Sequence, residues 1–269
     1  NKGWGGGLEA RPNGLAGWDT PPSAGTPDTR WVPYFEPDGP DASAYSGYTT
    51  YITDGVTGNQ ETRLKRSAKY VGQNKTNPNT DCNLQKIQPL INNKTTLKTQ
   101  IAGMISTGNT HVAIGAGWGW RTLSPEAPYT EGSQYGDNDW TKAMVLLTDG
   151  TNTTPSDSTF HKSSYTAYNY LIRNQLGTTN GPASETQQDV LTNTVCTNIK
   201  NKGIRLYTIL LNEPAQRAKN LMAGCATVDP NAPSANAQHQ LFYDSPSASD
   251  LNKIFQDIAN DLSNLRISQ

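Results

Sequence analysis

The stretch "MVLLTDGTNT", residues 144–153, decides the fold of this chain. Four consecutive apolar residues run into Thr148, Asp149 and Gly150, and further hydroxyl and amide side chains follow. A short continuous apolar run that stops at glycine is typical of a strand buried inside a parallel sheet. In such sheets the carboxyl ends of the strands form the edge where ligands bind. The stretch therefore predicts a buried strand that carries a carboxylate to a binding edge.

The rest of the chain from residue 86 repeats the alternation of strand and helix patterns. Further strands are predicted at 204–211 and 240–244. Segments with helical spacing of apolar residues are 90–105, 111–124, 186–203, 214–226 and 248–267. The third of these ends at Gly203, a typical C-terminal stop. The glycines at 115, 117 and 119 weaken the second helix, so we expect it to lie tight against the sheet. Together these patterns predict an α/β fold with a mostly parallel sheet flanked by helices.

Residues 1–85 have a different composition and are predicted to form a loop-rich insertion. The segment is dense in Gly, Pro, Asp and aromatic residues and has almost no helical or strand periodicity. Its many Trp and Tyr residues argue against a disordered segment. We therefore expect two regions: an aromatic insertion over 1–85, packed on the core, and an α/β domain over 86–269.

The composition and net charge limit the classes of binding partner and the cellular compartment that fit this chain. The formal net charge is −1, from 22 basic and 23 acidic residues, without a basic stripe. This balance argues against nucleic acid and against an anionic membrane surface as partners. The sequence has no apolar run of the roughly 18 residues that span a bilayer. The low charged fraction of 17% suits an extracytoplasmic protein. Because the chain begins at Asn1 rather than Met, we expect a mature form or a fragment.

Asp149 is the best candidate ligand for a hard divalent cation such as Mg²⁺ or Ca²⁺, which prefers oxygen ligands. The alternative is a strand-end aspartate whose side chain caps the next turn through an Asx hydrogen bond. Thr110 ends the loop "STGNT" before the glycine-rich helix, where its hydroxyl faces Asp149 or merely caps the helix. His111, Thr151 and Asn152 are further polar candidates beside these two.

Motifs for the common catalytic chemistries are absent. None of the three histidines stands in a nucleophile-elbow context, and the sequence contains no P-loop. Asp137 and Asp139 precede the strand and read as a solvated turn. We therefore expect a protein without enzymatic activity. The alternative is a carbohydrate-binding or hydrolytic envelope protein whose exposed aromatic residues form a sugar platform; otherwise they form a small core of the insertion. These aromatic residues are Trp4, Trp18, Trp31 and Tyr34.

Several motifs in one order carry a resemblance to a known family. "TDG" at 148–150 and "GNT" at 108–110 match the strand-end aspartate and the threonine loop of von Willebrand factor A (vWA) domains, a Rossmann-like fold. "WGWRTLSPEAPYTEG", "CTNIKNKGIRLYTI", "LMAGCA" and "DLSNLRISQ" resemble the C-terminal part of TadG-type proteins of the bacterial Tad (tight adherence, Flp) pilus system, and "RWVPYFEPDGPD" resembles their insertion. The resemblance covers most of the chain.

The resemblance implies a bacterial extracytoplasmic adhesion or assembly module that binds a protein partner, such as a pilus component, through a metal-ion-dependent adhesion site (MIDAS). Of the MIDAS ligands, this chain carries Thr110 and Asp149; the Asp-x-Ser-x-Ser strand is absent. That strand is central in a vWA sheet, so another segment must fill its slot. The strand comes from a separate N-terminal fragment, which we favour, from "YTTYITDG" (48–55), or from a partner protein.

The resemblance also bears on the three cysteines. An odd number in an oxidising compartment is read most simply as one pair and one free thiol. Cys196 and Cys225 lie on helices that flank the strand at 204–211, and we expect them to pair. Related proteins tend to have a further cysteine where this chain has Gly7, so Cys82 has either lost its partner or pairs with the absent part.

Overall fold

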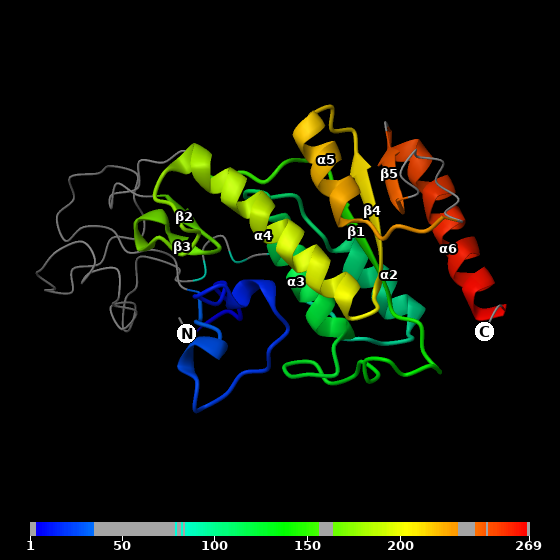
Figure 1. Cartoon of the computed structure of the whole chain (residues 1–269), viewed down its shortest axis with the longest axis horizontal. Helices are drawn as coiled ribbons and strands as arrows, with labels where there is room; N and C mark the ends of the chain where they lie inside the picture. Colours follow the sequence, from blue (N-terminus) through cyan, green and yellow to red (C-terminus); the bar gives the residue numbers. More distant parts are fainter. Residues whose placement is uncertain are drawn as a thin grey trace, which may run out of the picture.

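A three-stranded parallel sheet lies between helices in the right half of the view in Figure 1. Its strands are β1 (Ala143–Thr148), β4 (Arg205–Leu211) and β5 (Phe242–Ser245), in the spatial order β1-β4-β5. The computed structural model describes residues 4–34, 79, 82, 84–155, 164–230, 240–245 and 247–267. The α/β class and the three strands that the sequence predicts are confirmed.

Helices cover both faces of this sheet. α3 (Val112–Leu123), α4 (Gly181–Asn201) and α5 (Gln216–Cys225) share one apolar cluster with the side chains of β1 and β4 that point to their face. The opposite face of β4 and β5 packs on α6 (Leu251–Ile267), which continues the 3₁₀ turn η5 (Ala248–Asp250). β4 is buried on both faces, as its continuous apolar sequence predicts.

The glycine-rich helix α3 does lie tight against the sheet. A Cβ added at Gly119 would meet Met144 Sδ of β1 at 2.8 Å, which is closer than side chains tolerate. A Cβ at Gly117 would instead lie 3.0 Å from Arg121 Nη1 and 3.5 Å from the carbonyl oxygen of Ala16. The glycines therefore allow close contact on two sides, to the sheet and to the N-terminal segment.

Two helices begin at residues other than those predicted. α4 begins at Gly181 rather than 186, because Asn180 accepts a hydrogen bond from the Ala183 amide and a proline stands in the first turn. It ends before Gly203, whose φ of +73° stops the helix as expected. α2 (Lys94–Ala102) is shorter than the predicted 90–105 and has no buried residue.

The described N-terminal residues, 4–34, contain two short turns, η1 (Leu15–Gly17) and η2 (Pro27–Thr29), and η1 packs on α3 and α4. The side chain of Arg11 is buried and donates hydrogen bonds to the carbonyl oxygens of Leu15, Trp18, Thr20 and Thr29. Arg121 of α3 donates to Ala16 and Trp18. Residues 35–78, which include "YTTYITDG", lie outside the described residues.

Two smaller elements complete the described chain. β2 (Tyr165–Thr166) and β3 (Asn169–Tyr170) form an antiparallel hairpin, and η4 (Leu171–Arg173) follows it. A backbone hydrogen bond from Ala10 N to the carbonyl oxygen of Ala167 joins the hairpin to the N-terminal segment. The hairpin therefore lies next to the N-terminal residues (Figure 1) and not in the main sheet.

A disulfide joins Cys196 of α4 to Cys225 of α5, as expected, and both cysteines are buried. Cys82 is a free thiol. Its Sγ lies against Gly7, where an added Cβ would overlap it. Position 7 is therefore the place in the described chain from which a second cysteine would reach Cys82.

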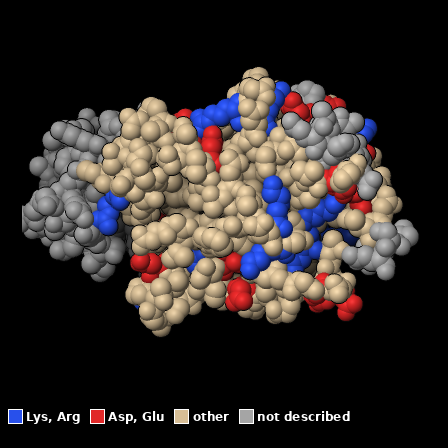
Figure 2. Space-filling view, in the orientation of Figure 1, with Lys and Arg blue, Asp and Glu red and all other residues tan. Residues whose placement is uncertain are grey.

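On the face shown in Figure 2, uncharged residues cover most of the surface, and Lys/Arg and Asp/Glu side chains form small separate groups. Within the described residues, no helix has both the length and the apolar content needed to cross a bilayer.

Candidate functional site

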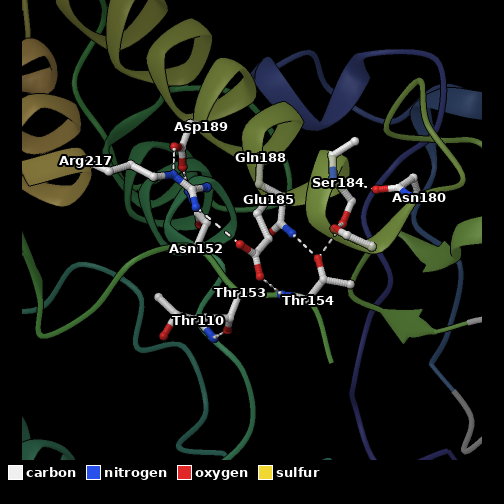
Figure 3. Close-up of polar contacts among 12 residues, drawn as sticks. Thr110, Asn152, Thr153, Thr154, Asn180, Ser184, Glu185, Gln188, Asp189 and Arg217 are labelled. Carbon is white, nitrogen blue, oxygen red and sulfur yellow. Dashed lines mark hydrogen bonds and ion pairs between the residues drawn. The ribbon is translucent and has the colours of Figure 1, made fainter. Parts of the chain in front are cut away.

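Two loops meet at the carboxyl-terminal edge of β1. The carbonyl oxygen of Thr110 accepts a 3.0 Å hydrogen bond from the Thr153 amide, and Thr153 Oγ1 accepts one of 3.0 Å from the Thr110 amide. This reciprocal pair fixes the threonine loop before α3 against the loop after β1 (Figure 3). The sequence predicted that Thr110 and Asp149 would share this edge of the sheet, and the structure brings their loops together.

The Thr110 hydroxyl and Asp149 lie on adjacent parts of this edge. Thr110 Oγ1 is 3.7 Å from the position that a Cβ would occupy at Gly150, the residue after Asp149. Thr110 is half-buried and Asp149 is exposed. Among the described residues, no hydrogen bond or ion pair engages the Thr110 hydroxyl or the Asp149 carboxylate. Both oxygen groups are therefore available to an external ligand.

Asn152 has a structural position at this edge. It is fully buried, and its Oδ1 accepts a 2.8 Å hydrogen bond from the Val112 amide at the first turn of α3. Its Nδ2 donates to Asp189 Oδ1 at 2.8 Å and to Thr192 Oγ1 at 3.2 Å. Asn152 was predicted to bind a ligand, but its amide group is used to hold the loop, α3 and α4 together. Thr151 is half-buried beside it.

His111 also belongs to a buried polar network. Its Nδ1 lies 2.5 Å from Gln188 Oε1, and Gln188 Nε2 donates to Thr154 Oγ1 at 2.9 Å. The edge of its ring meets Tyr168, with 5.6 Å between the ring centroids. Burial lowers the pKa of His111 from its ordinary value, so the neutral ring is favoured. Because Gln188 donates to Thr154, its oxygen accepts the Nδ1 proton of His111.

Arg217, Glu185 and Asp189 form an ion-paired group beside the loop that follows β1, and the sequence did not predict it. Arg217 of α5 donates from Nε to Asp189 Oδ2 at 2.6 Å and from Nη1 to Glu185 Oε2 at 3.2 Å. Glu185 in turn accepts from the Thr154 amide at 3.3 Å (Figure 3). Two acidic residues four apart on one helix were the only sequence signal for this group. The group links α4, α5 and the loop after β1.

The metal-ligand set within the described residues is small. They contain no group of three or more His, Cys, Asp and Glu side chains that could hold a metal ion. Thr110 and Asp149 alone offer one hydroxyl and one carboxylate. Mg²⁺ and Ca²⁺ accept such ligands together with water, so these two residues fit part of a cation site and leave the remaining positions to other groups.

The aromatic residues of the N-terminal segment divide into packed and exposed ones. Trp31 stacks on Trp118 of α3 with 5.2 Å between the ring centroids, and Arg11 and Arg121 lie over it. Tyr34 packs on Tyr165 of the hairpin. Trp4 and Trp18 are about half exposed. A sugar platform is therefore limited to the last two, because Trp31 and Tyr34 are used in packing.

Glu9 links the N-terminal segment to the hairpin. Its carboxylate accepts hydrogen bonds from Tyr165 Oη at 2.5 Å and Asn169 Nδ2 at 2.9 Å. Burial raises the pKa of Glu9 above its ordinary 4.5, although these two donors oppose the effect. In the folded chain Glu9 therefore keeps its proton at pH values at which Glu9 of the unfolded chain has lost it.

We expect Glu9 to make the folded state less stable as pH rises through this window, because stability falls with pH wherever the folded state binds more protons. Urea unfolding of the wild type and of Glu9→Gln at several pH values from 4 to 7 measures the effect. The wild type should lose stability relative to the variant as pH rises. A difference that stays constant over this range would show that Glu9 titrates normally.

Comparison with known proteins identified no relative: no family model, curated protein or solved structure matches this chain. Function must therefore be argued from the residues at this edge of the sheet.

Proposed function

We propose that the chain is a non-enzymatic, extracytoplasmic adhesion or assembly module, similar to the vWA domain of TadG-type proteins of the Tad pilus system. It binds a protein partner through a divalent cation held in part by Thr110 and Asp149. The observation that carries the proposal is the position of the Thr110 hydroxyl, 3.7 Å from a Cβ at Gly150, next to the exposed Asp149. These are the two residues that the MIDAS pattern requires at these loops.

The chemistry of such a site is binding, not catalysis. The carboxylate of Asp149 supplies negative charge, and Thr110 supplies a neutral oxygen. A cation held by few protein ligands keeps open positions, and a carboxylate of the protein partner fills one of them. The remaining ligands come from outside the described residues, and an N-terminal fragment of the same protein is the source we favour. The buried Cys196–Cys225 disulfide supports an oxidising compartment.

Replacing Asp149 should abolish cation binding at this edge. We expect Asp149→Ala to weaken the binding of Mn²⁺ or Mg²⁺ to the intact chain by about tenfold or more, because it removes the only charged ligand of the pair. Isothermal titration calorimetry measures the affinity. Thr110→Ala should weaken binding by a smaller factor.

Asp139→Ala is the matched control, because Asp139 is also exposed but stands before β1, at the opposite end of the strand. Unfolding curves of all three variants should match the wild type, since the Asp149 and Thr110 side chains make no hydrogen bond within the described residues. Equal Mn²⁺ affinity of wild type and Asp149→Ala, or an equal loss in Asp139→Ala, would rule out the proposed cation site.

A further inference from the structure

The sequence contains two Asn–Gly dipeptides, Asn13–Gly14 and Asn180–Gly181. Asparagine is thermolabile, because the amide nitrogen of the next residue can attack its side chain. Glycine hinders this attack least, since it has no side chain and a permissive backbone. Both asparagines are exposed. The sequence therefore does not separate the two dipeptides, and their local structure does.

An exposed turn carries Asn13 and Gly14. Their φ angles of +54° and +76° are those of the central residues of a type I′ turn, and the Leu15 amide closes it by donating to the carbonyl oxygen of Pro12 at 3.1 Å. Asn13 Nδ2 donates to Oδ2 of the exposed Asp28 at 2.7 Å. Among the described residues, the Gly14 amide donates no hydrogen bond. The attacking nitrogen is therefore available, and few contacts have to open before it reaches the side chain.

The second dipeptide belongs to the start of α4. Asn180 Oδ1 accepts a 2.9 Å hydrogen bond from the Ala183 amide, and its carbonyl oxygen accepts one of 2.9 Å from the Ser184 amide. The carbonyl oxygen of Gly181 accepts another from Ser184 Oγ at 2.5 Å. To bring the Asn180 side chain onto the Gly181 amide, the cap must break and the first turn of α4 must unwind.

We propose that Asn13 is a site of spontaneous deamidation, whereas the start of α4 protects Asn180. The Gly14 nitrogen loses its proton and bonds to Asn13 Cγ, the Cγ–Nδ2 bond breaks, and Nδ2 leaves as ammonia. Water then opens the cyclic imide at either carbonyl carbon and leaves aspartate or isoaspartate. One water is consumed and one ammonia is released, without a change of oxidation state. The inference does not depend on the cation site proposed above.

The modification changes the charge and the length of this turn. A carboxylate replaces the amide that donates to Asp28, so a hydrogen bond becomes a contact between like charges. Isoaspartate also adds one carbon atom to the backbone of the turn that Leu15 and Pro12 close. The carbonyl oxygen of Leu15 accepts a 3.0 Å hydrogen bond from the buried Arg11. Deamidation therefore loosens the segment that packs η1 on α3 and α4.

Peptide mass spectrometry of the intact chain, aged at mildly alkaline pH and then cut with a protease, measures conversion at both asparagines. We expect Asn13 to convert about tenfold or more faster than Asn180, because a helix cap and a helical turn must open before the second reacts. In urea the two rates should be similar. A protein-isoaspartate methyltransferase with labelled S-adenosylmethionine detects the isoaspartate product.

Three variants test the role of the turn. Asp28→Ala removes the acceptor of the Asn13 side chain and should speed conversion at Asn13 about threefold, with Asn180 unchanged. Asn13→Gln is the matched control, because it keeps the amide but would have to close a larger ring, and it should give no product at this position. Asn13→Asp represents the aspartate product and should speed hydrogen exchange at the Leu15 amide about threefold.

Equal conversion of Asn13 and Asn180 in the folded chain would overturn the proposal, since the turn would then protect as well as the helix cap. A ratio of rates that is the same with and without urea would show that the fold does not select the site. Unchanged exchange of the Leu15 amide in Asn13→Asp would contradict the loosening of the turn. Because these measurements include no divalent cation, their failure leaves the Asp149 site untouched.

Discussion

Replacing Arg205 by methionine should lower the free energy of unfolding by about 3 kcal/mol, the lower end of the range for breaking a buried ion pair. Arg205 begins β4 and donates from Nη2 to Asp229 at 2.5 Å and to Asp261 of α6 at 2.7 Å. The three side chains keep only 13–17% of their surface exposed. Methionine preserves most of the volume but removes the guanidinium that both carboxylates contact.

Two comparisons separate lost charge pairing from lost packing. The triple variant Arg205→Met, Asp229→Asn and Asp261→Asn should recover part of the lost stability, since it removes the repulsion between the two neighbouring carboxylates. Lys253→Met is the matched control on α6, because the Lys253–Asp257 pair is an exposed contact and should change stability by about 0.5 kcal/mol or less. Urea unfolding at pH 7 measures all three. If the triple variant were no more stable than Arg205→Met, repulsion between the two carboxylates would not be the cause of the lost stability.

The elements of the sheet could be predicted because their signals are local. Apolar runs marked β1 and β4, and Gly203 marked the end of α4. The early start of α4 was also visible in Asn180 and the proline that follows, but the apolar spacing used to find the helix begins later. α2 was predicted too long, since apolar residues continue past Ala102 although the structure leaves them exposed.

The polar network of the candidate site could be predicted only in part. The place of Asp149 at the end of an apolar run predicted its position at the carboxyl edge of the sheet, and the place of Thr110 in the loop before a helix predicted that it lies at the same edge. The role of Asn152 could not be read from the sequence, because its partners Val112 and Asp189 are 40 and 37 residues away. The same holds for His111 and Gln188, which are 77 residues apart. A polar side chain carries no sequence periodicity that shows whether it faces solvent or a buried partner.

The fold also depends on a covalent link between the two helices that pack beside β4. Removing the Cys196–Cys225 disulfide, by Cys196→Ala and Cys225→Ala together, should lower the free energy of unfolding by about 3.5 kcal/mol. The bond spans a sequence separation of 29 residues, and the entropy lost by the unfolded chain on closing a loop of this length gives that value. The cost adds to the packing lost where the two sulfurs are buried between α4 and α5.

Cys82→Ala controls for loss of a thiol, because Cys82 is outside the disulfide and only half-buried. Its stability should stay within about 1 kcal/mol of the wild type. Because Cys196 and Cys225 are 1% and 0% exposed, a thiol reductant should reach them only through unfolding. Reduction in mild urea should therefore follow the unfolding rate and not the reductant concentration. A double variant as stable as Cys82→Ala would mean that the packing of α4 on α5 is sufficient without the disulfide. It would also mean that closing the loop does not destabilise the unfolded chain.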